Sequence, residues 1–107
     1  MIRKAKIKDI KQIQELIGCF AKQNVMLPRS LNELYESIRD FWVYEEKAKI
    51  YGCAALHISW DDLAEIKSLA VAKKVQGKGI GQDLVVTCLA EAAVLGAKKI
   101  FVLTYKP

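Results

Sequence analysis

The sequence has few of the residues that build metal centres, disulfide frameworks or membrane spans. It contains one histidine, His57, and three widely separated cysteines that are not spaced like a zinc or redox motif: Cys19, Cys53 and Cys88. We therefore expect reduced cysteines and no metal site. No apolar run approaches the roughly 18 residues of a membrane span, and the amino terminus lacks the apolar core of a signal peptide. These absences predict a cytoplasmic protein that does not bind a membrane.

Arginine is scarce beside lysine. Of the 17 basic residues, 14 are lysines scattered along the chain, and the net charge is +5. Nucleic-acid binding typically needs clustered basic residues and forked arginine contacts, so this charge favours a solvated surface or attraction to a small polyanion instead. The 107-residue length and the hydrophobic content of 52% fit one globular domain over residues 1–107.

Periodicity and turn residues predict a mixed α/β protein in the order β-α-α-β-β-β-α-β. The expected elements are a strand at 2–5, a helix at 9–22, a second helix after the Ser30–Glu33 capping box, strands at 41–45, 49–58 and 63–71, a helix from 80 that Gly96 ends, and a strand at 98–104. The last two strands should be parallel neighbours, because a helix joins them. We expect His57 to be a strand residue at the sheet face rather than a ligand or base.

Glycine is also scarce, yet three of the six glycines stand at alternate positions, 77, 79 and 81. They separate a predicted strand from the helix that follows, where unpaired amides and the helix dipole attract phosphate. Lys73, Lys74 and Lys78 add positive charge. This pattern indicates a pyrophosphate cradle; the alternative is a turn that only starts the helix. A P-loop fails on spacing because Gln82 stands where it needs its second glycine. A dinucleotide fingerprint fails as well, because its third glycine would fall on Gln82 or, in the other register, on Leu84.

The segment from Gln76 to Gly81 resembles the Q/R-x-x-G-x-G/A signature that holds the pyrophosphate of acetyl-coenzyme A in the GNAT superfamily of N-acetyltransferases. The predicted element order agrees with the acyl-CoA N-acyltransferase fold of that family. LPRS, CAALH, LAEIKSLAV, GKGIG and FVLTY are similar to the acetyltransferase domain of bacterial N-acetylglutamate synthases of arginine biosynthesis. Family domains continue past the LTY strand with another helix and one or two strands, so we expect a C-terminally short member of the family.

The resemblance implies which residues bind the cofactor, and it implies no metal. In the family the pantetheine arm of acetyl-coenzyme A lies along the strand before the signature, like an extra strand. The matching residues here are Leu69, Ala70 and Val71, whose backbone groups would hold the arm. The signature residues would bind the pyrophosphate, and they are Gln76, Gly77, Lys78, Gly79, Ile80 and Gly81.

The resemblance also implies a general base and a proton donor. Glu65 lies in the strand where the family often places a base, and Tyr105 would protonate the leaving thiolate. Ser68 and Thr104 would contact the acceptor. Because Glu65 and Ser68 lie on opposite faces of a regular strand, both reach the cleft only if a bulge intervenes. The alternative for Glu65 is a solvated glutamate at a strand end.

The expected reaction is transfer of an acetyl group from acetyl-coenzyme A to a small amine, with the α-amino group of L-glutamate or a related amino acid as the leading acceptor. An acidic acceptor needs a forked donor, for which Arg29 is the candidate; the alternative is a surface arginine before a helix cap. Other candidate functions are acetylation of a polyamine, a protein lysine or a protein amino terminus, and an inactive coenzyme-A-binding or assembly module. The last strand forms an exposed edge in this reading, which predicts a homodimer.

Overall fold

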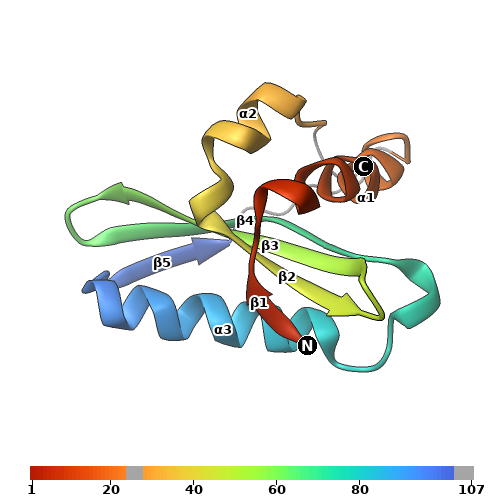
Figure 1. Cartoon of the computed structure of the whole chain (residues 1–107). Coiled ribbons are helices and arrows are strands. Elements are labelled where there is room, and N and C mark those ends of the chain that lie inside the picture. Colours follow the sequence, from red (N-terminus) through yellow and green to blue (C-terminus); the bar gives the residue numbers. More distant parts are fainter. Residues whose placement is uncertain (24–27, 103–107) are drawn as a thin grey trace.

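The computed structural model describes residues 1–23 and 28–102. A five-stranded sheet in the order β1-β2-β3-β4-β5 separates two layers of helices (Figure 1). The elements are β1 (Ile2–Lys4), η1 (Ile7–Asp9), α1 (Ile10–Ala21), α2 (Leu31–Glu36), η2 (Ile38–Asp40), β2 (Phe41–Glu46), β3 (Lys49–Trp60), β4 (Leu63–Val71), η3 (Lys73–Val75), α3 (Ile80–Leu95) and β5 (Lys99–Val102), where η marks a 3-10 turn. The predicted order of strands and helices is confirmed.

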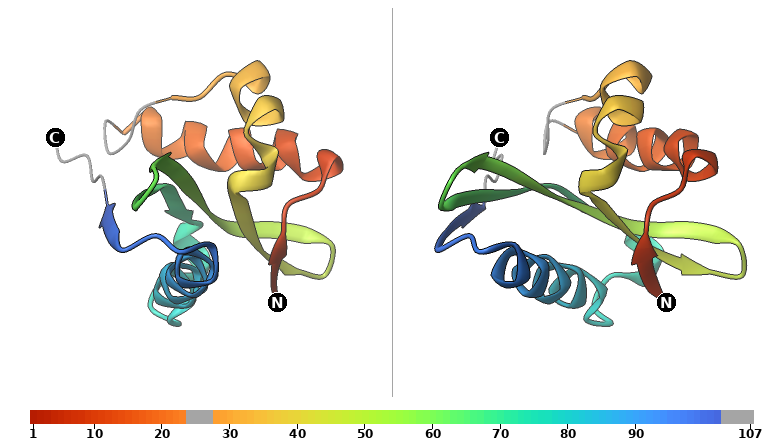
Figure 2. Two further views of the ribbon diagram at one scale, coloured as in Figure 1. Left: turned by 90° about the vertical axis from the view of Figure 1, so that its left-hand side faces the viewer. Right: turned by 60° about the vertical axis from the view of Figure 1, so that its left-hand side comes forward.

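The sheet is antiparallel from β1 to β4, and β4 and β5 are parallel. This confirms the parallel pairing predicted for the last two strands, which the α3 crossover requires. Helices α1 and α2 cover one face of the sheet and α3 covers the other (Figure 2). We call these the α1/α2 face and the α3 face.

Each face of the sheet has its own apolar core. On the α1/α2 face, buried side chains of α1 pack on Phe41, Val43 and Cys53. On the α3 face, an i, i+4 stripe of α3 packs on the sheet, and its residues are Ile80, Leu84, Cys88 and Ala92. The helical period of the sequence also places Val85 and Leu89 on this face; Val85 packs against the core, but Leu89 is 41% exposed, because it lies farther round the helix from the sheet.

Several element ends differ from the sequence prediction. The Ser30–Glu33 capping box is present, but α2 ends at Glu36 because Ser37 leaves helical geometry at φ −105° and ψ 20°. Strand β3 extends to Trp60, so the predicted turn shrinks to residues 61–62. The β2–β3 connection is a tight turn with positive φ at Lys47 and Ala48, a geometry that suits the twist of a hairpin.

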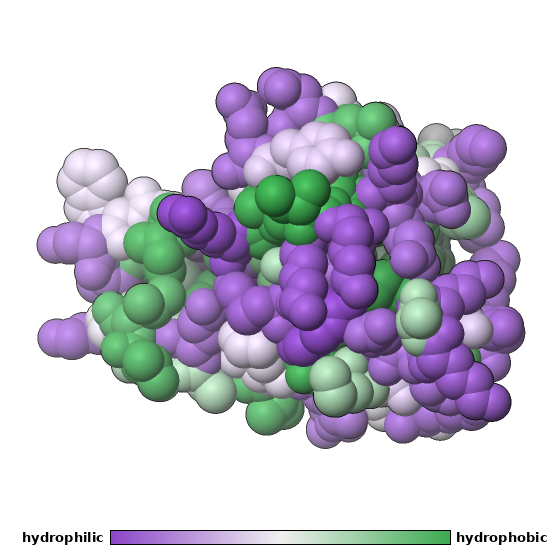
Figure 3. Space-filling view, viewed as in Figure 1, coloured by the Kyte–Doolittle hydropathy of each residue, from purple (hydrophilic) through white to green (hydrophobic). Residues whose placement is uncertain are grey.

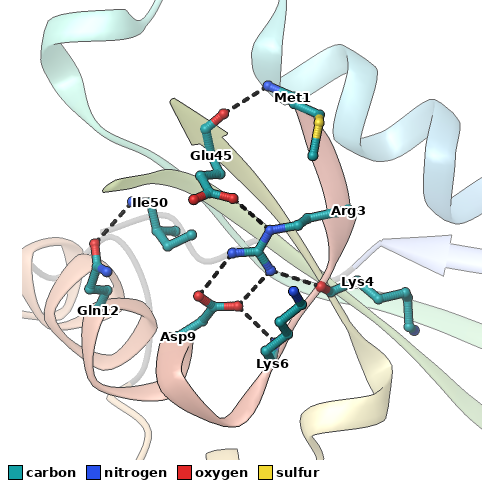
Figure 4. A network of polar contacts seen from close by, with 8 residues as sticks. All are labelled: Met1, Arg3, Lys4, Lys6, Asp9, Gln12, Glu45 and Ile50. Atoms are coloured by element: carbon teal, nitrogen blue, oxygen red, sulfur yellow. Dashed lines mark hydrogen bonds and ion pairs between the residues drawn. The ribbon is translucent and has the colours of Figure 1, made fainter. Parts of the chain in front are cut away.

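Arg3 ties β1 to the layer of α1 (Figure 4). Its guanidinium donates to Asp9 Oδ2 at 2.7 Å and Oδ1 at 3.0 Å, and to Glu45 Oε1 at 2.7 Å. Asp9 also accepts from the Lys6 amide at 2.7 Å and is only 2% exposed. Burial alone would raise the pKa of Asp9, but the hydrogen bonds from Arg3 and Lys6 and the charge of Arg3 together hold that pKa below its usual value. The network therefore fixes the start of α1 against the sheet.

Candidate active site

Strand β4 contains a bulge at Ser68. Ala55 of β3 pairs with Lys67, whereas Cys53 pairs with Ala70, so two residues of β4 face one residue of β3. Ser68 has φ +56°, in the left-handed region, and its carbonyl accepts from the Cys53 thiol at 3.4 Å. The bulge shifts the alternation of the strand, since Ile66 packs on the α3 face and Ala70 on the α1/α2 face. This is the irregularity that Glu65 and Ser68 need to reach the same face.

Arg29, which precedes α2, lies on this face as well. Its Nη1 donates to Ser68 Oγ at 2.7 Å, and its Cζ lies 6.0 Å from the centre of the Phe41 ring. Its Nε is 3.5 Å from Glu33 Oε2, whose side chain is 57% exposed. The Arg29 side chain is only 15% exposed, which is unlike an ordinary surface arginine. The structure thus brings Arg29 and Ser68 together, three residues along β4 from Glu65.

Glu65 lies in the middle of the sheet. It pairs with His57 of β3 on one side and with Phe101 of β5 on the other, and it is 9% exposed. Within residues 1–23 and 28–102, no side chain is hydrogen bonded to its carboxylate. A carboxylate that is shielded but unbonded is free to take a proton from a ligand.

A cleft of about 400 Å³ opens where β4 ends and α3 begins. Its lining contains every predicted cofactor-binding residue except Lys78, namely Leu69, Ala70, Val71, Gln76, Gly77, Gly79, Ile80 and Gly81, together with Phe20, Val75 and Gln82. Lys78 lies beside the cleft in a hollow of about 260 Å³ that Lys47 and Lys74 also line. The cleft is therefore bounded by lysines on one side.

Two of the three loop glycines are required by the backbone. Gly77 has φ +83° and Gly79, the residue before α3, has φ +82°, conformations that favour glycine. Gly81 has no such requirement, because it lies within α3 without a positive φ. A Cβ at Gly81 would meet only Val71 Cγ2, at 3.5 Å. Since Gly81 lines the cleft, its missing side chain leaves the amides at the start of α3 open to a ligand.

Beside this cleft, no described strand pairs with the last residues of β4 on the β5 side. Within the described residues, β4 pairs with β5 only from Leu63 to Ile66, so the β5 side of Leu69 to Val71 carries no ladder there. The Gln76 side chain donates from Nε2 to the Val71 carbonyl at 2.9 Å and joins the glycine loop to the strand end. An extended ligand segment thus has unpaired backbone to lie against.

Two predicted residues, Thr104 and Tyr105, lie outside the described residues. Two residues near the site were not predicted from the sequence. Phe20 lines the cleft, although its helical spacing suggested a core position in α1. Asp40 Oδ2 lies 2.9 Å from His57 Nδ1. No local pattern signals the Asp40–His57 contact, because it joins residues of η2 and β3.

The part of the chain that the structure describes holds no group of three or more His, Cys, Asp or Glu side chains placed to bind a metal ion. In the same residues, no helix has both the length and the apolar character needed to cross a bilayer.

Comparison with known proteins gives consistent matches. A family model described as an acetyltransferase (GNAT) domain matches residues 36–106. An amino-acid acetyltransferase of Mycobacterium tuberculosis is 37% identical over 109 residues, which cover 99% of this chain and 62% of the relative.

Two solved structures of similar sequence also have the fold of this chain. A crystal structure of a Mycobacterium tuberculosis protein in complex with CoA and NLQ has a TM-score of 0.93 at 37% identity, and the match covers 97% of this chain and 64% of that one. The N-acetylglutamate synthase of Neisseria gonorrhoeae, complexed with coenzyme A and N-acetyl-glutamate, has a TM-score of 0.92 at 34% identity, and the match covers 97% of this chain and 25% of that one. The chain thus spans less than two thirds of the length of these relatives.

Proposed function

The chain belongs to the GNAT acetyltransferase family, and from that premise we propose that it transfers the acetyl group of acetyl-coenzyme A to the α-amino group of glutamate or a related amino acid. The observation that carries the proposal is the contact of Arg29 with Ser68 on the face of β4 that also carries Glu65, three residues away and near the glycine cleft. This arrangement offers a carboxylate-binding cation and a base at the same place.

The residues of the cleft fit coenzyme A. The glycine at position 81 keeps free a space that a side chain would fill, and the amides at the start of α3 together with the neighbouring lysines suit a pyrophosphate. The backbone of Leu69, Ala70 and Val71, which no described strand pairs on the β5 side, suits the pantetheine arm. When bound, acetyl-coenzyme A supplies an activated acetyl group; the protein then has to orient the acceptor and move its proton.

Glu65 takes the proton of the acceptor in this proposal. A free amino acid carries an ammonium group at neutral pH, and its nitrogen is nucleophilic only after a proton leaves. The Glu65 carboxylate is shielded by two neighbouring strands and has no hydrogen-bond partner in the described chain, so it is available to accept that proton. Tyr105 remains the candidate donor to the thiolate, and Thr104 remains a candidate acceptor contact.

Arg29 orients the acceptor. Its present partners are two neutral hydroxyls, Ser68 Oγ and Ser37 Oγ, and an exposed carboxylate, Glu33, at 3.5 Å. A substrate carboxylate would replace these weaker contacts with a forked pair. The Neisseria gonorrhoeae relative, which is 34% identical, was crystallised with N-acetyl-glutamate, and this supports an acidic amino acid as the acceptor. A half-buried guanidinium disfavours cationic acceptors such as polyamines.

The proposal extends to assembly, location and role. We propose a single domain acting as a homodimer in the cytoplasm, with a role in arginine biosynthesis suggested by the resemblance to the N-acetylglutamate synthases. Apolar side chains gather over β5 and the end of α3 (Figure 3), where Val94, Leu95, Phe101 and Val102 are exposed, and this supports a contact with another subunit.

The test is thiol release from acetyl-coenzyme A in the presence of single acceptors. We expect turnover with glutamate and with closely related amino acids, and none with spermidine or a lysine peptide. Turnover with spermidine alone would reject the amino-acid assignment. Binding of acetyl-coenzyme A without turnover for any acceptor would instead support the inactive binding module.

A further inference from the structure

His57, the chain's only histidine, pairs with Glu65 across the ladder and contacts Asp40, and neither His57 nor Asp40 has a role in the acetyl transfer proposed above. His57 Nδ1 lies 2.9 Å from Asp40 Oδ2. Asp40 ends η2, immediately before β2, and the partner of His57 across the ladder in β4 is Glu65. Two carboxylates therefore flank one imidazole.

The imidazole and the Glu65 carboxylate project from the same face. The preceding pair in this ladder, Leu56 and Ile66, belongs to the core on the α3 face. Side chains alternate along a strand, so the pair His57 and Glu65 projects toward the α1/α2 face. Residues directly opposed in an antiparallel ladder have Cβ atoms about 4.5–5.5 Å apart. In the described chain His57 forms its ion pair with Asp40 and none with Glu65, so a proton passes between His57 and Glu65 through one bridging water.

The strand order also orients the imidazole ring. Strand β2 flanks β3 on one side and β4 flanks it on the other, so Asp40 and Glu65 lie on opposite sides of His57. Because an ionised carboxylate only accepts hydrogen bonds, the Nδ1–Asp40 contact favours the tautomer with the proton on Nδ1 and the lone pair on Nε2. Nε2 is at the far edge of the ring from Asp40 and therefore faces the side of β4.

We propose that His57 is a proton-relay residue that returns Glu65 to its ionised form, an inference that rests on the proposed acetyl transfer. The proton leaves the acceptor ammonium for a Glu65 oxygen and then passes through one water to His57 Nε2. The resulting imidazolium keeps its Nδ1–H bond to Asp40 and releases the Nε2 proton to water. Glu65 is 9% exposed, whereas the His57 side chain is 46% exposed, so the relay connects a shielded base to solvent.

Three charged groups face this imidazole from the elements beside it. Asp40 comes from η2, Glu65 comes from β4, and Lys67 lies two residues farther along the same face of β4. Asp40 is the carboxylate in contact with the ring. His57 acts through Glu65 and is a positioning residue for the proton, not a catalytic one.

The relay is tested with His57→Gln, which keeps a polar side chain but cannot carry a proton between its two ends. We expect turnover with glutamate in dilute buffer to fall about tenfold, less than the roughly 10²–10⁴-fold of a direct general base because His57 acts through Glu65, with an unchanged acceptor KM. Added free imidazole should restore the rate in proportion to its concentration. Asp40→Asn should give a smaller loss, and Ile58→Thr, an exposed neighbour on the opposite face of β3, is the matched control.

Wild-type turnover in His57→Gln, or a loss that imidazole does not repair, would overturn the relay. A second measurement does not depend on turnover: the ¹⁵N spectrum of the single histidine should show the Nδ1–H tautomer in wild type and lose that preference in Asp40→Asn. The Nε2–H tautomer in wild type would contradict the arrangement. Absence of acetyl transfer by the wild-type chain would contradict the proposed function. In that case the ¹⁵N spectrum of His57 would still show whether Asp40 orients the imidazole ring.

Discussion

Arg29 and Ser68 meet across 39 residues of sequence, with Arg29 Nη1 donating to Ser68 Oγ at 2.7 Å. The contact depends on the β4 bulge, because Ser68 would otherwise project toward α3. It joins the segment before α2 to the strand that carries Glu65. One hydrogen bond thus links the proposed acceptor-binding cation to the strand that carries the proposed base.

Arg29→Lys should weaken acceptor binding. Lysine keeps the positive charge but cannot form a forked pair with a carboxylate, so we expect KM for glutamate to rise about tenfold or more with a smaller change in kcat. Steady-state kinetics with glutamate measure this. Arg39→Lys, an exposed arginine of η2, is the matched control and should keep the wild-type KM. An equal effect in both variants would argue against Arg29 as the acceptor contact.

Gly81→Val should block the coenzyme A cleft without unfolding the domain. Gly81 has no positive φ, and its Cβ would make one ordinary contact, so the backbone accepts a side chain there. The stiff valine side chain would occupy the space in front of the α3 amides, and we expect affinity for coenzyme A to fall about 100-fold, as for the loss of two charge-assisted hydrogen bonds. Calorimetric titration measures this.

Gly81→Ala is the control for that variant, because the family signature admits alanine at this position. It should bind coenzyme A nearly as wild type does and be at least as stable, since alanine favours helix over glycine. Gly79 is the poorer test, because its φ of +82° strains any substituted residue whatever the space around it. Wild-type affinity of Gly81→Val for coenzyme A would show that the glycine loop does not bind the pyrophosphate.

Asp9→Asn should destabilise the fold at neutral pH, by about 2 kcal/mol, because hydrogen bonds to a charged group are lost from a buried site. The folded-state pKa of Asp9 lies below the unfolded value of about 3.9, so its stabilisation is present above that pH and is lost as the pH falls below it. Urea unfolding of wild type and Asp9→Asn should therefore show a difference in the free energy of unfolding that is smaller at pH 3 than at pH 7.

Asp61→Asn, which changes an exposed aspartate, is the control and should have the wild-type free energy of unfolding at both pH values. If Asp9→Asn is as stable as wild type at pH 7, the Arg3 network does not contribute to folding in the way its geometry indicates.

Cysteine alkylation should distinguish one thiol from the other two. Cys19 is exposed, whereas Cys53 and Cys88 are buried. Burial raises the pKa of Cys53 to about 12 and that of Cys88 to about 11, so neither forms the reactive thiolate at neutral pH. Iodoacetamide at pH 7.5 should modify Cys19 alone in the native protein and all three after denaturation. Mass spectrometry of tryptic peptides checks this, and rapid native labelling of Cys53 would indicate an open bulge.

Local patterns predicted most of the fold. The i, i+4 stripe of α3, the Ser30–Glu33 box and Gly96 after α3 each act within one or two helical turns, so they can be read from the sequence. The candidate site is less predictable, because it is assembled by long-range contacts. The sequence showed that a bulge was needed for Glu65 and Ser68 to share a face, but the positive φ that provides it falls on a serine, a residue that rarely signals that conformation. The Asp40–His57 contact had no sequence signal.

The role of Glu65 as the base is tested most directly by comparing wild type with Glu65→Gln in two measurements on the same samples, coenzyme A affinity and acetyl transfer to glutamate. Glutamine fills the same space but cannot accept the ammonium proton, so we expect a dissociation constant within about twofold of wild type and turnover lower by about 100-fold. Turnover of Glu65→Gln at the wild-type rate would show that Glu65 is not the base.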